Sequence, residues 1–222
     1  MNAPEYIFEA SSKPSLSWHE VPLLRATDKS VKGYGSLVED PQNFSIEIVQ
    51  WPKQGWRPID EGTGDEAGWV EGEFLGEWKG DVLFGSNAAV NGHYVLGWST
   101  DPKSANKQKQ TASRDQVLLW HMNYHPDGGQ MFWPMQKKPF IVPVALAGDN
   151  LKPDNVIALW CDGSKGLYIH PGIWHEGIFP VEDKQSFLDR QGRVHARVSA
   201  DIGKEFGVYL ACPLRSEKII DL

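Results

Sequence analysis

Glycine divides much of the chain into short segments, and this spacing constrains the fold more than any other feature of the sequence. Between Trp69 and Trp98, glycines at positions 72, 76, 80, 85, 92 and 97 separate short strand-like pieces. Such spacing favours strands joined by hairpin turns. The 222 residues contain 22 glycines and 15 prolines. The sequence therefore predicts an all-β sandwich or barrel.

The expected strands show either period-two alternation or a short buried apolar run. They cover residues 45–51, 69–78, 81–84, 94–98, 117–120, 140–146, 167–169, 174–179 and 206–211. Pro143 predicts an edge position or a bulge, because proline cannot donate to a strand ladder. One short helix is expected over residues 153–161, with Asp154 as its cap and Gly163 at its end.

Chain length and internal pattern predict one domain. The chain has 41% hydrophobic residues, enough to bury a core, and shows no repeat of fixed period. We expect a single unit over residues 1–222, with an N-terminal β elaboration over 1–115 and a histidine-bearing core over 116–215. The glycine- and aspartate-rich segment 60–68 is expected to be a loop before the histidine-bearing half.

Charge and composition exclude several kinds of partner. The net charge of −7 argues against nucleic acid, which needs a clustered cationic surface. No apolar stretch approaches the roughly 18 residues that cross a bilayer, and the first residues lack the apolar core of a secretory signal. The two cysteines, Cys161 and Cys212, form no disulfide framework. We therefore expect a cytoplasmic protein that binds neither membranes nor nucleic acid.

Four of the seven histidines form two pairs beside turns, His121 with His125 and His170 with His175. Imidazole is both a common metal ligand and the usual general acid or base near neutral pH. His121 and His125 lack the glutamate of a zinc-protease helix, because Met122 follows His121. The sequence contains no serine-hydrolase, P-loop or dinucleotide-binding motif. Pairs of histidines on neighbouring strands predict a site inside the barrel.

Residues 171–175, with the sequence Pro-Gly-Ile-Trp-His, resemble the second motif of cupin barrels. A wider set of blocks resembles the ureidoglycolate lyase family, a cupin family of allantoin degradation. The blocks are HPDGGQMFWP at 125–134, FIVPVALA at 140–147, PDNVIALW at 153–160, GSKGLYIHPGIWH at 163–175 and FLDR at 187–190. This resemblance implies a cupin-type barrel, also described as a double-stranded β-helix or jelly roll.

The resemblance implies a lyase that cleaves a C–N bond in ureidoglycolate, or in a related small 2-hydroxy or amido acid. The products would be glyoxylate and urea, within purine metabolism. A base removes the hydroxyl proton of such a substrate and an acid protonates the departing nitrogen. The implied partners are a small carboxylate substrate and a second copy of the chain in a homodimer.

The predicted site residues come mainly from these blocks. The predicted catalytic residues are His125, His175, Glu176 and His170. The predicted substrate-binding residues are Gln130, Lys138, Trp174 and Arg190. The predicted ligands for a divalent metal, which would be Ni, Zn, Mn or Fe, are His121, His125, Gln130 and His175.

Three positions depart from the family pattern. Glu176 replaces a second histidine, Pro171 replaces a frequent arginine, and Asn123 stands where glutamate is common. Glu176 is predicted to act as acid or base in place of that histidine. Strand alternation gives the opposite expectation, because it turns Glu176 outward when His175 points inward.

Two other functions stay open at this point. A metal-dependent cupin with three imidazoles on one iron would be an oxygenase or isomerase acting on another small carboxylate. A barrel without catalysis would bind a small acid or a carbohydrate, with tryptophan rings stacked on the ligand.

Overall fold

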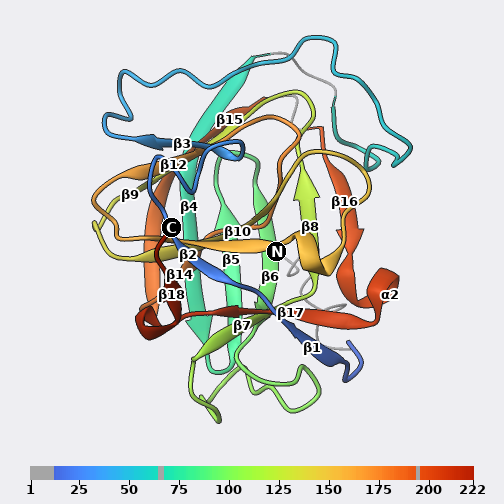
Figure 1. Ribbon diagram of the computed structural model, residues 1–222, viewed down its shortest axis with the longest axis vertical. Coiled ribbons are helices and arrows are strands. Elements are labelled where there is room, and N and C mark those ends of the chain that lie inside the picture. The colour runs from blue at the N-terminus through green and yellow to red at the C-terminus, as the bar shows by residue number, and fades with distance from the viewer. Residues whose placement is uncertain (1–12, 65–67, 194–195) are drawn as a thin grey trace.

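The computed structural model describes residues 13–64, 68–193 and 196–222, which form two β-sheets (Figure 1). The larger sheet has ten strands in the order β1 (Ser17–Glu20), β17 (Val208–Pro213), β7 (Gln116–Leu119), β6 (Gly92–Trp98), β5 (Val82–Asn87), β4 (Trp69–Lys79), β15 (Lys184–Gly192), β9 (Gln130–Pro134), β12 (Gly166–Ile169) and β3 (Gly35–Val38). The second sheet has the order β16 (Val198–Asp201), β8 (His121–Tyr124), β13 (Trp174–His175), β10 (Phe140–Ala145), β11 (Ile157–Cys161), β2 (Leu23–Arg25) and β18 (Ile219–Ile220), and β14 (Phe179–Pro180) also pairs with β10. The prediction of an all-β, cupin-type fold is confirmed.

The glycine-punctuated segment forms the predicted meander. Strands β4, β5, β6 and β7 pair in sequence as antiparallel neighbours. Gly80, in the turn between β4 and β5, has a φ of +58°, and a Cβ there would lie 2.0 Å from the carbonyl oxygen of Asn106. Only glycine fits this turn. Strand β4 also pairs with β15, so strands from both halves of the chain share one sheet; the division at residues 115 and 116 stays a prediction.

The helix predicted over residues 153–161 is wrong. Pro153–Asn155 is a 3-10 turn, and the following residues are β11, in the second sheet. A short apolar run is as compatible with a buried strand as with a helix, and here the pairing with β10 decides for the strand. The α-helix in the described residues is α2 (Ile202–Phe206), capped by the Asp201 side chain and ended by Gly207. No helix in these residues is long and apolar enough to cross a membrane.

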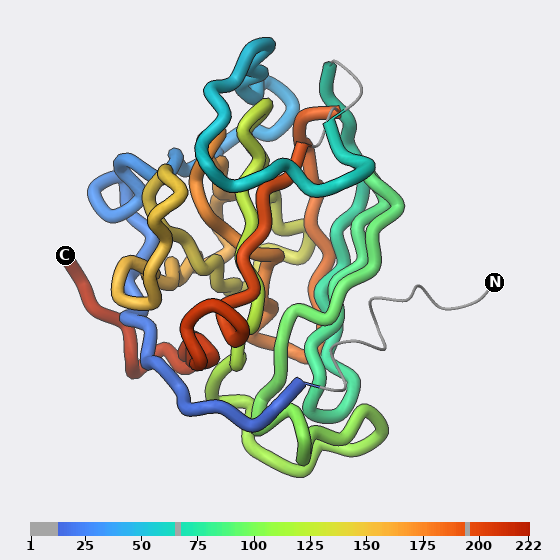
Figure 2. The backbone as a smooth tube through the Cα atoms, turned by 90° about the vertical axis from the view of Figure 1, so that its right-hand side faces the viewer, coloured from blue at the N-terminus to red at the C-terminus, as the bar shows by residue number. Residues whose placement is uncertain are grey.

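The strand predicted over residues 45–51 is also wrong. That part of the chain makes one isolated bridge, between Ile48 and Gly128, and belongs to a segment that runs across the top of the barrel (Figures 1 and 2). We call residues 39–64 the crossing segment. Arg57 binds Glu205 at 2.6 Å and so ties the segment to α2. Residues 65–67 of the predicted loop, and residues 1–12, where no secretory signal is expected, lie outside the described residues.

Pro143 lies in an interior strand, not at the predicted edge or bulge. It is registered with Ala158 of β11 on one side. On the other side, β13 pairs with Val144 and Ala145, and β14 pairs with residues 140 and 141. The proline therefore lies opposite the gap between two short partner strands, where the ladder is interrupted and a missing N–H is tolerated.

Aromatic rings fill much of the space between the sheets. Phe187 of β15 is fully buried and packs edge-on against Phe140, with ring centroids 5.1 Å apart. Phe74 packs in the same way against Phe132 at 5.6 Å. Phe74 and Phe132 also line a cavity whose other walls carry polar side chains.

We expect Phe187→Ala to lower the free energy of unfolding by about 3–5 kcal/mol, because it empties a close-packed site that cannot collapse fully. The matched control is Trp51→Ala, since Trp51 is 91% exposed; we expect a change within about 0.5 kcal/mol for it. Urea unfolding followed by fluorescence measures both. Equal losses for the two variants would contradict the placement of β15 against the core.

Candidate active site

A cavity of about 160 Å³ lies between the two sheets. From the larger sheet it is lined by three amides, which we call the amide wall: Asn87, Gln130 and Gln191. From the second sheet and its adjoining loops it is lined by a set that we call the charged wall: His121, His125, His175, Glu176 and Arg197. The volume is below the roughly 300–1,000 Å³ of pockets for drug-sized ligands, so a ligand here is a small molecule.

Strand alternation explains which side chains line the cavity. His121 and Asn123 share one face of β8, as the sequence predicts, and both line the cavity. On β15, residues 187, 189 and 191 share the inward face, and they are more buried than Leu188 and Arg190 between them. On β8 and β15 the side chains that line the cavity therefore come from one face of the strand.

His121 and Glu176 form a close pair in the charged wall. The His121 Nδ1 lies 2.6 Å from Glu176 Oε2, and the Gly177 N–H donates to the other carboxylate oxygen at 2.9 Å. Burial would raise the pKa of Glu176, but the charge and hydrogen bond of His121 and the Gly177 N–H outweigh it and lower that pKa. The carboxylate is therefore ionised, and it fixes the proton of His121 on Nδ1. The outward orientation expected from alternation is wrong, because β13 ends at His175.

A chain of hydrogen bonds joins the two walls. The His175 Nδ1 lies 2.8 Å from the carbonyl oxygen of Ile173, and its Nε2 lies 3.0 Å from Gln130 Oε1. The Gln130 amide in turn donates to Asp189 at 2.8 Å, and Asn87 donates to the same carboxyl at 2.7 Å. Burial lowers the pKa of His175, against the opposing effects of the Ile173 carbonyl and Glu176. Burial therefore favours the neutral ring, whose single N–H donates to one of these two oxygens.

His125 lies beside this series of hydrogen bonds, next to His175. Its ring centroid is 5.2 Å from that of His175, and its Nδ1 lies 2.9 Å from the carbonyl oxygen of Ala196. Its own carbonyl oxygen accepts from the Gly172 N–H at 2.8 Å. That bond ties the end of β8 to the proline–glycine turn and brings the two predicted histidine blocks together.

The structure thus brings together five predicted site residues: His121, His125, Gln130, His175 and Glu176. The other four do not line the cavity. Lys138 forms an ion pair with Glu182 at the surface. Arg190 binds Glu71 at 2.6 Å, on the opposite face of β15 from the cavity.

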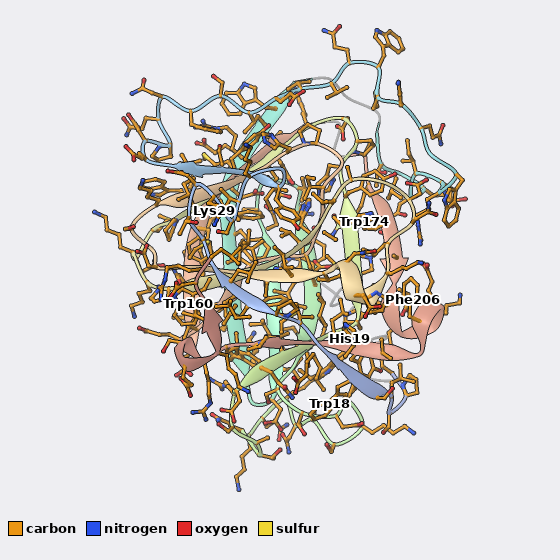
Figure 3. The ribbon with its side chains drawn as sticks, viewed as in Figure 1. Trp18, His19, Lys29, Trp160, Trp174 and Phe206 are labelled. Atoms are coloured by element: carbon orange, nitrogen blue, oxygen red, sulfur yellow. The ribbon has the colours of Figure 1, made fainter. Side chains whose placement is uncertain are left out.

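Trp174 and His170 also lie outside the cavity lining. Trp174 is fully buried, and its Nε1 donates to the carbonyl oxygen of Gly148 at 2.7 Å. Figure 3 places it near β8, whereas Trp160 lies on the other side of the molecule. The His170 ring packs edge-on against Tyr168, with centroids 5.2 Å apart. Packing accounts for both side chains.

Sequence reasoning missed Arg197, Asp189 and Gln191. Arg197 is the one arginine or lysine among the described residues that line the cavity. Its Nε donates to Asp60 of the crossing segment at 2.7 Å. Alternation along 184–192 is the signal for the other two, since it separates Asp189 and Gln191 from Arg190. No local pattern marks Arg197, because its partner is 137 positions away.

The four predicted metal ligands, His121, His125, Gln130 and His175, all line the cavity. Among the described residues, no three histidine, cysteine or acidic side chains converge on one point. The Nδ1 atoms of His121, His125 and His175 are paired with Glu176, Ala196 and Ile173 respectively. Gln130 is bonded to His175 and Asp189. A divalent metal stays a prediction from the histidine pattern.

Fold and cavity together define a cupin-type β-barrel with a polar site between its sheets. Residues 100–201 match the model of the family described as ureidoglycolate lyase. The resemblance read from the sequence blocks is therefore confirmed over that part of the chain.

Curated relatives agree with this match. The chain is 40% identical over 78 residues to the ureidoglycolate lyase of Stutzerimonas stutzeri, covering 34% of this chain and 46% of the relative. It is 40% identical over 70 residues to that of Pseudomonas paraeruginosa, covering 31% and 41%. The chain thus spans less than half the length of these relatives.

Asp189 makes stability depend on pH. Burial raises its pKa to about 7, although hydrogen bonds from Gln130 and Asn87 oppose the shift. An unfolded aspartate titrates near 3.9. Between about pH 4 and pH 7 the folded protein keeps a proton that the unfolded chain releases, so the free energy of unfolding falls as pH rises. The side chain of the Asp189→Asn variant cannot ionise, so we expect its free energy of unfolding not to fall over this pH range. Urea unfolding at about pH 5 and about pH 8 measures it, and equal pH dependence in both proteins would contradict the assignment.

Proposed function

We propose that the protein is a carbon–nitrogen lyase that cleaves ureidoglycolate, or a close 2-hydroxy ureido acid, into glyoxylate and urea. The single observation behind this proposal is the composition of the cavity. A half-buried arginine and a histidine–carboxylate pair face three amides in a space of about 160 Å³. The similarity of residues 100–201 to the ureidoglycolate lyase family supports the same reaction.

Arg197 is the proposed carboxylate-binding residue. Asp60 accepts from its Nε, which orients the guanidinium and, despite burial, raises its pKa. A guanidinium has further N–H donors in a planar fork that matches a carboxylate. Lys138 and Arg190, expected from the sequence to bind substrate, lie outside the cavity lining. The substrate carboxylate is therefore placed against Arg197.

His121 is the proposed acid–base residue. Because Nδ1 donates to Glu176, Nε2 is the atom that exchanges a proton with the substrate. Nε2 takes the hydroxyl proton of the substrate while the electrons of that O–H bond form the new C=O bond. The C–N bond breaks, its electrons remain on nitrogen, and the same proton passes from Nε2 to the departing urea. Glu176 stabilises the transient imidazolium.

His175 and His125 are proposed to position this reaction. The ring of His175 lies between the carbonyl oxygen of Ile173 and Gln130 Oε1, at the contact of the charged wall with the amide wall. His125 packs beside it and narrows the cavity. Neither ring needs to change its proton in the proposed steps.

Glyoxylate release from racemic ureidoglycolate by the purified protein tests the proposal, with and without an added divalent metal. We expect release by the wild type, and a loss of about a hundredfold or more in kcat for Glu176→Gln, because the imidazolium loses its counter-charge. No release by folded protein under either condition would contradict the lyase assignment and favour a binding protein or another reaction.

Arg197→Met should raise KM for ureidoglycolate by roughly tenfold or more, since it removes a charged hydrogen-bond donor from the carboxylate. The matched control is Arg215→Met, because Arg215 forms an exposed ion pair with Asp115; we expect its KM to stay at the wild-type value. Steady-state kinetics on the three proteins measures the effect. An unchanged KM in Arg197→Met would contradict the proposed substrate orientation.

We also propose a cytoplasmic homodimer that acts in allantoin degradation. The two cysteines are buried and unpaired, which suits a reducing compartment. The homodimer and the pathway come from the family resemblance. Analytical ultracentrifugation tests the dimer directly.

A further inference from the structure

The three amides of the amide wall differ in how they are satisfied. Asn87 donates to Asp189 through Nδ2 at 2.7 Å and accepts from the Ala89 N–H at 2.9 Å. Gln130 is bonded at both ends, to Asp189 at 2.8 Å and to His175 at 3.0 Å. In both of these amides, therefore, the oxygen and the NH₂ group form hydrogen bonds within the protein.

Gln191 does not. Its side chain lines the cavity and the residue is 1% exposed. In the part of the chain that the structure describes, neither Nε2 nor Oε1 has a hydrogen-bond partner. Buried polar groups in folded proteins are almost always paired, and leaving one unpaired costs free energy. A bound molecule that satisfies both atoms would remove this cost.

The backbone holds Gln191 firmly in place. Strand β15 pairs with β9 on one side and β4 on the other, and Gln191 is registered with Gln130 and with Val70. A polar group on the interior strand of a sheet is presented with little freedom. The amide therefore offers one donor and one acceptor side by side at a fixed place in the cavity.

We propose that the Gln191 amide binds the carbamoyl end of the substrate through two parallel hydrogen bonds. Its Nε2–H donates to the carbamoyl oxygen, and its Oε1 accepts from the terminal N–H. This assignment deepens the proposed lyase function, on which it rests, by naming Gln191 as the residue that selects a ureido acid.

A carbamoyl group matches Gln191 better than the other polar groups of such a substrate. A carboxylate has acceptors only, so it would leave Oε1 facing an oxygen, and Arg197 is the group suited to it. A plain acyl group ends in carbon and would leave Oε1 unpaired. Sites built to hydrogen-bond a group reject analogues that lack it, because their own buried polar atoms then stay unpaired.

Two inert probes test the proposal by calorimetric titration. N-carbamoylglycine has the carboxylate and the ureido group but no hydroxyl, so the proposed reaction cannot cleave it. N-acetylglycine differs only by a methyl group in place of the terminal NH₂. We expect the wild type to bind N-carbamoylglycine about tenfold more tightly than N-acetylglycine, and Gln191→Met to bind the two equally.

Gln185→Met is the matched control. Gln185 lies on the same face of β15 and is also 1% exposed, but it does not line the cavity. We expect this variant to keep the tenfold preference. Equal affinity of the wild type for the two probes, binding of neither probe, or an unchanged preference in Gln191→Met would each overturn the proposal.

The glyoxylate assay and the probe titrations separate the role of Gln191 from the lyase reaction. Glyoxylate release by a wild type without probe preference would leave the lyase function intact and reject the role of Gln191. A Gln191-dependent preference in a protein that releases no glyoxylate would support the ureido site and reject the proposed reaction.

Discussion

The pairing of β15 with two neighbours is the constraint on which the rest of the site depends. On one side β15 pairs with β4, the first strand of the glycine-punctuated meander, and on the other with β9, which begins at Gln130. This double pairing joins the two halves of the chain in one sheet. Because it fixes the register, it also fixes which side chains of β15 face inward: Phe187 in the core, Asp189 against the amides of Asn87 and Gln130, and Gln191 at the cavity.

Burial and hydrogen-bond partners together determine the pKa values of the ionisable groups at the cavity. Glu176 stays ionised because the opposite charge of His121 and the Gly177 N–H offset the cost of burial. Asp189 accepts from the neutral amides of Asn87 and Gln130, and burial raises its pKa to about 7. Asp60 raises the pKa of Arg197, against the effect of partial burial. The pKa values of these two buried carboxyl groups are thus shifted in opposite directions because their partners differ.

The crossing segment links the periphery of the fold to the site. Its Asp60 binds Arg197, and its Arg57 binds Glu205 in α2. Figures 1 and 2 show this segment above the barrel, and the contact of Arg57 with Glu205 links it to α2, which is far away along the chain. A segment without regular strands therefore positions the proposed carboxylate-binding group.

Local sequence patterns predicted the all-β fold, the meander and the shared face of His121 and Asn123. These features depend on neighbours along the chain. The helix over residues 153–161 was wrong because a short buried apolar run has no period that separates strand from helix.

The site residues were predicted only in part, because local patterns do not show which face of a strand is buried. Alternation separates Asp189 from Arg190 but does not say which of them faces the interior. That choice depends on Glu71 and on the carbonyl oxygens of residues 41 and 44, which bind the Arg190 guanidinium on the opposite face. Arg197 was missed because Asp60, its partner, is remote in the sequence. The orientation of both arginines is determined by tertiary contacts, which sequence periodicity does not contain.

The proposed function requires that one small ureido acid binds between the charged wall and the amide wall. A crystal structure of the protein with N-carbamoylglycine would show whether it does. We expect the ligand inside the cavity, with its carboxylate on Arg197, its central carbon beside His121 and its carbamoyl group on Gln191. A ligand bound in the reverse orientation, or bound outside the space between the sheets, would contradict this expectation.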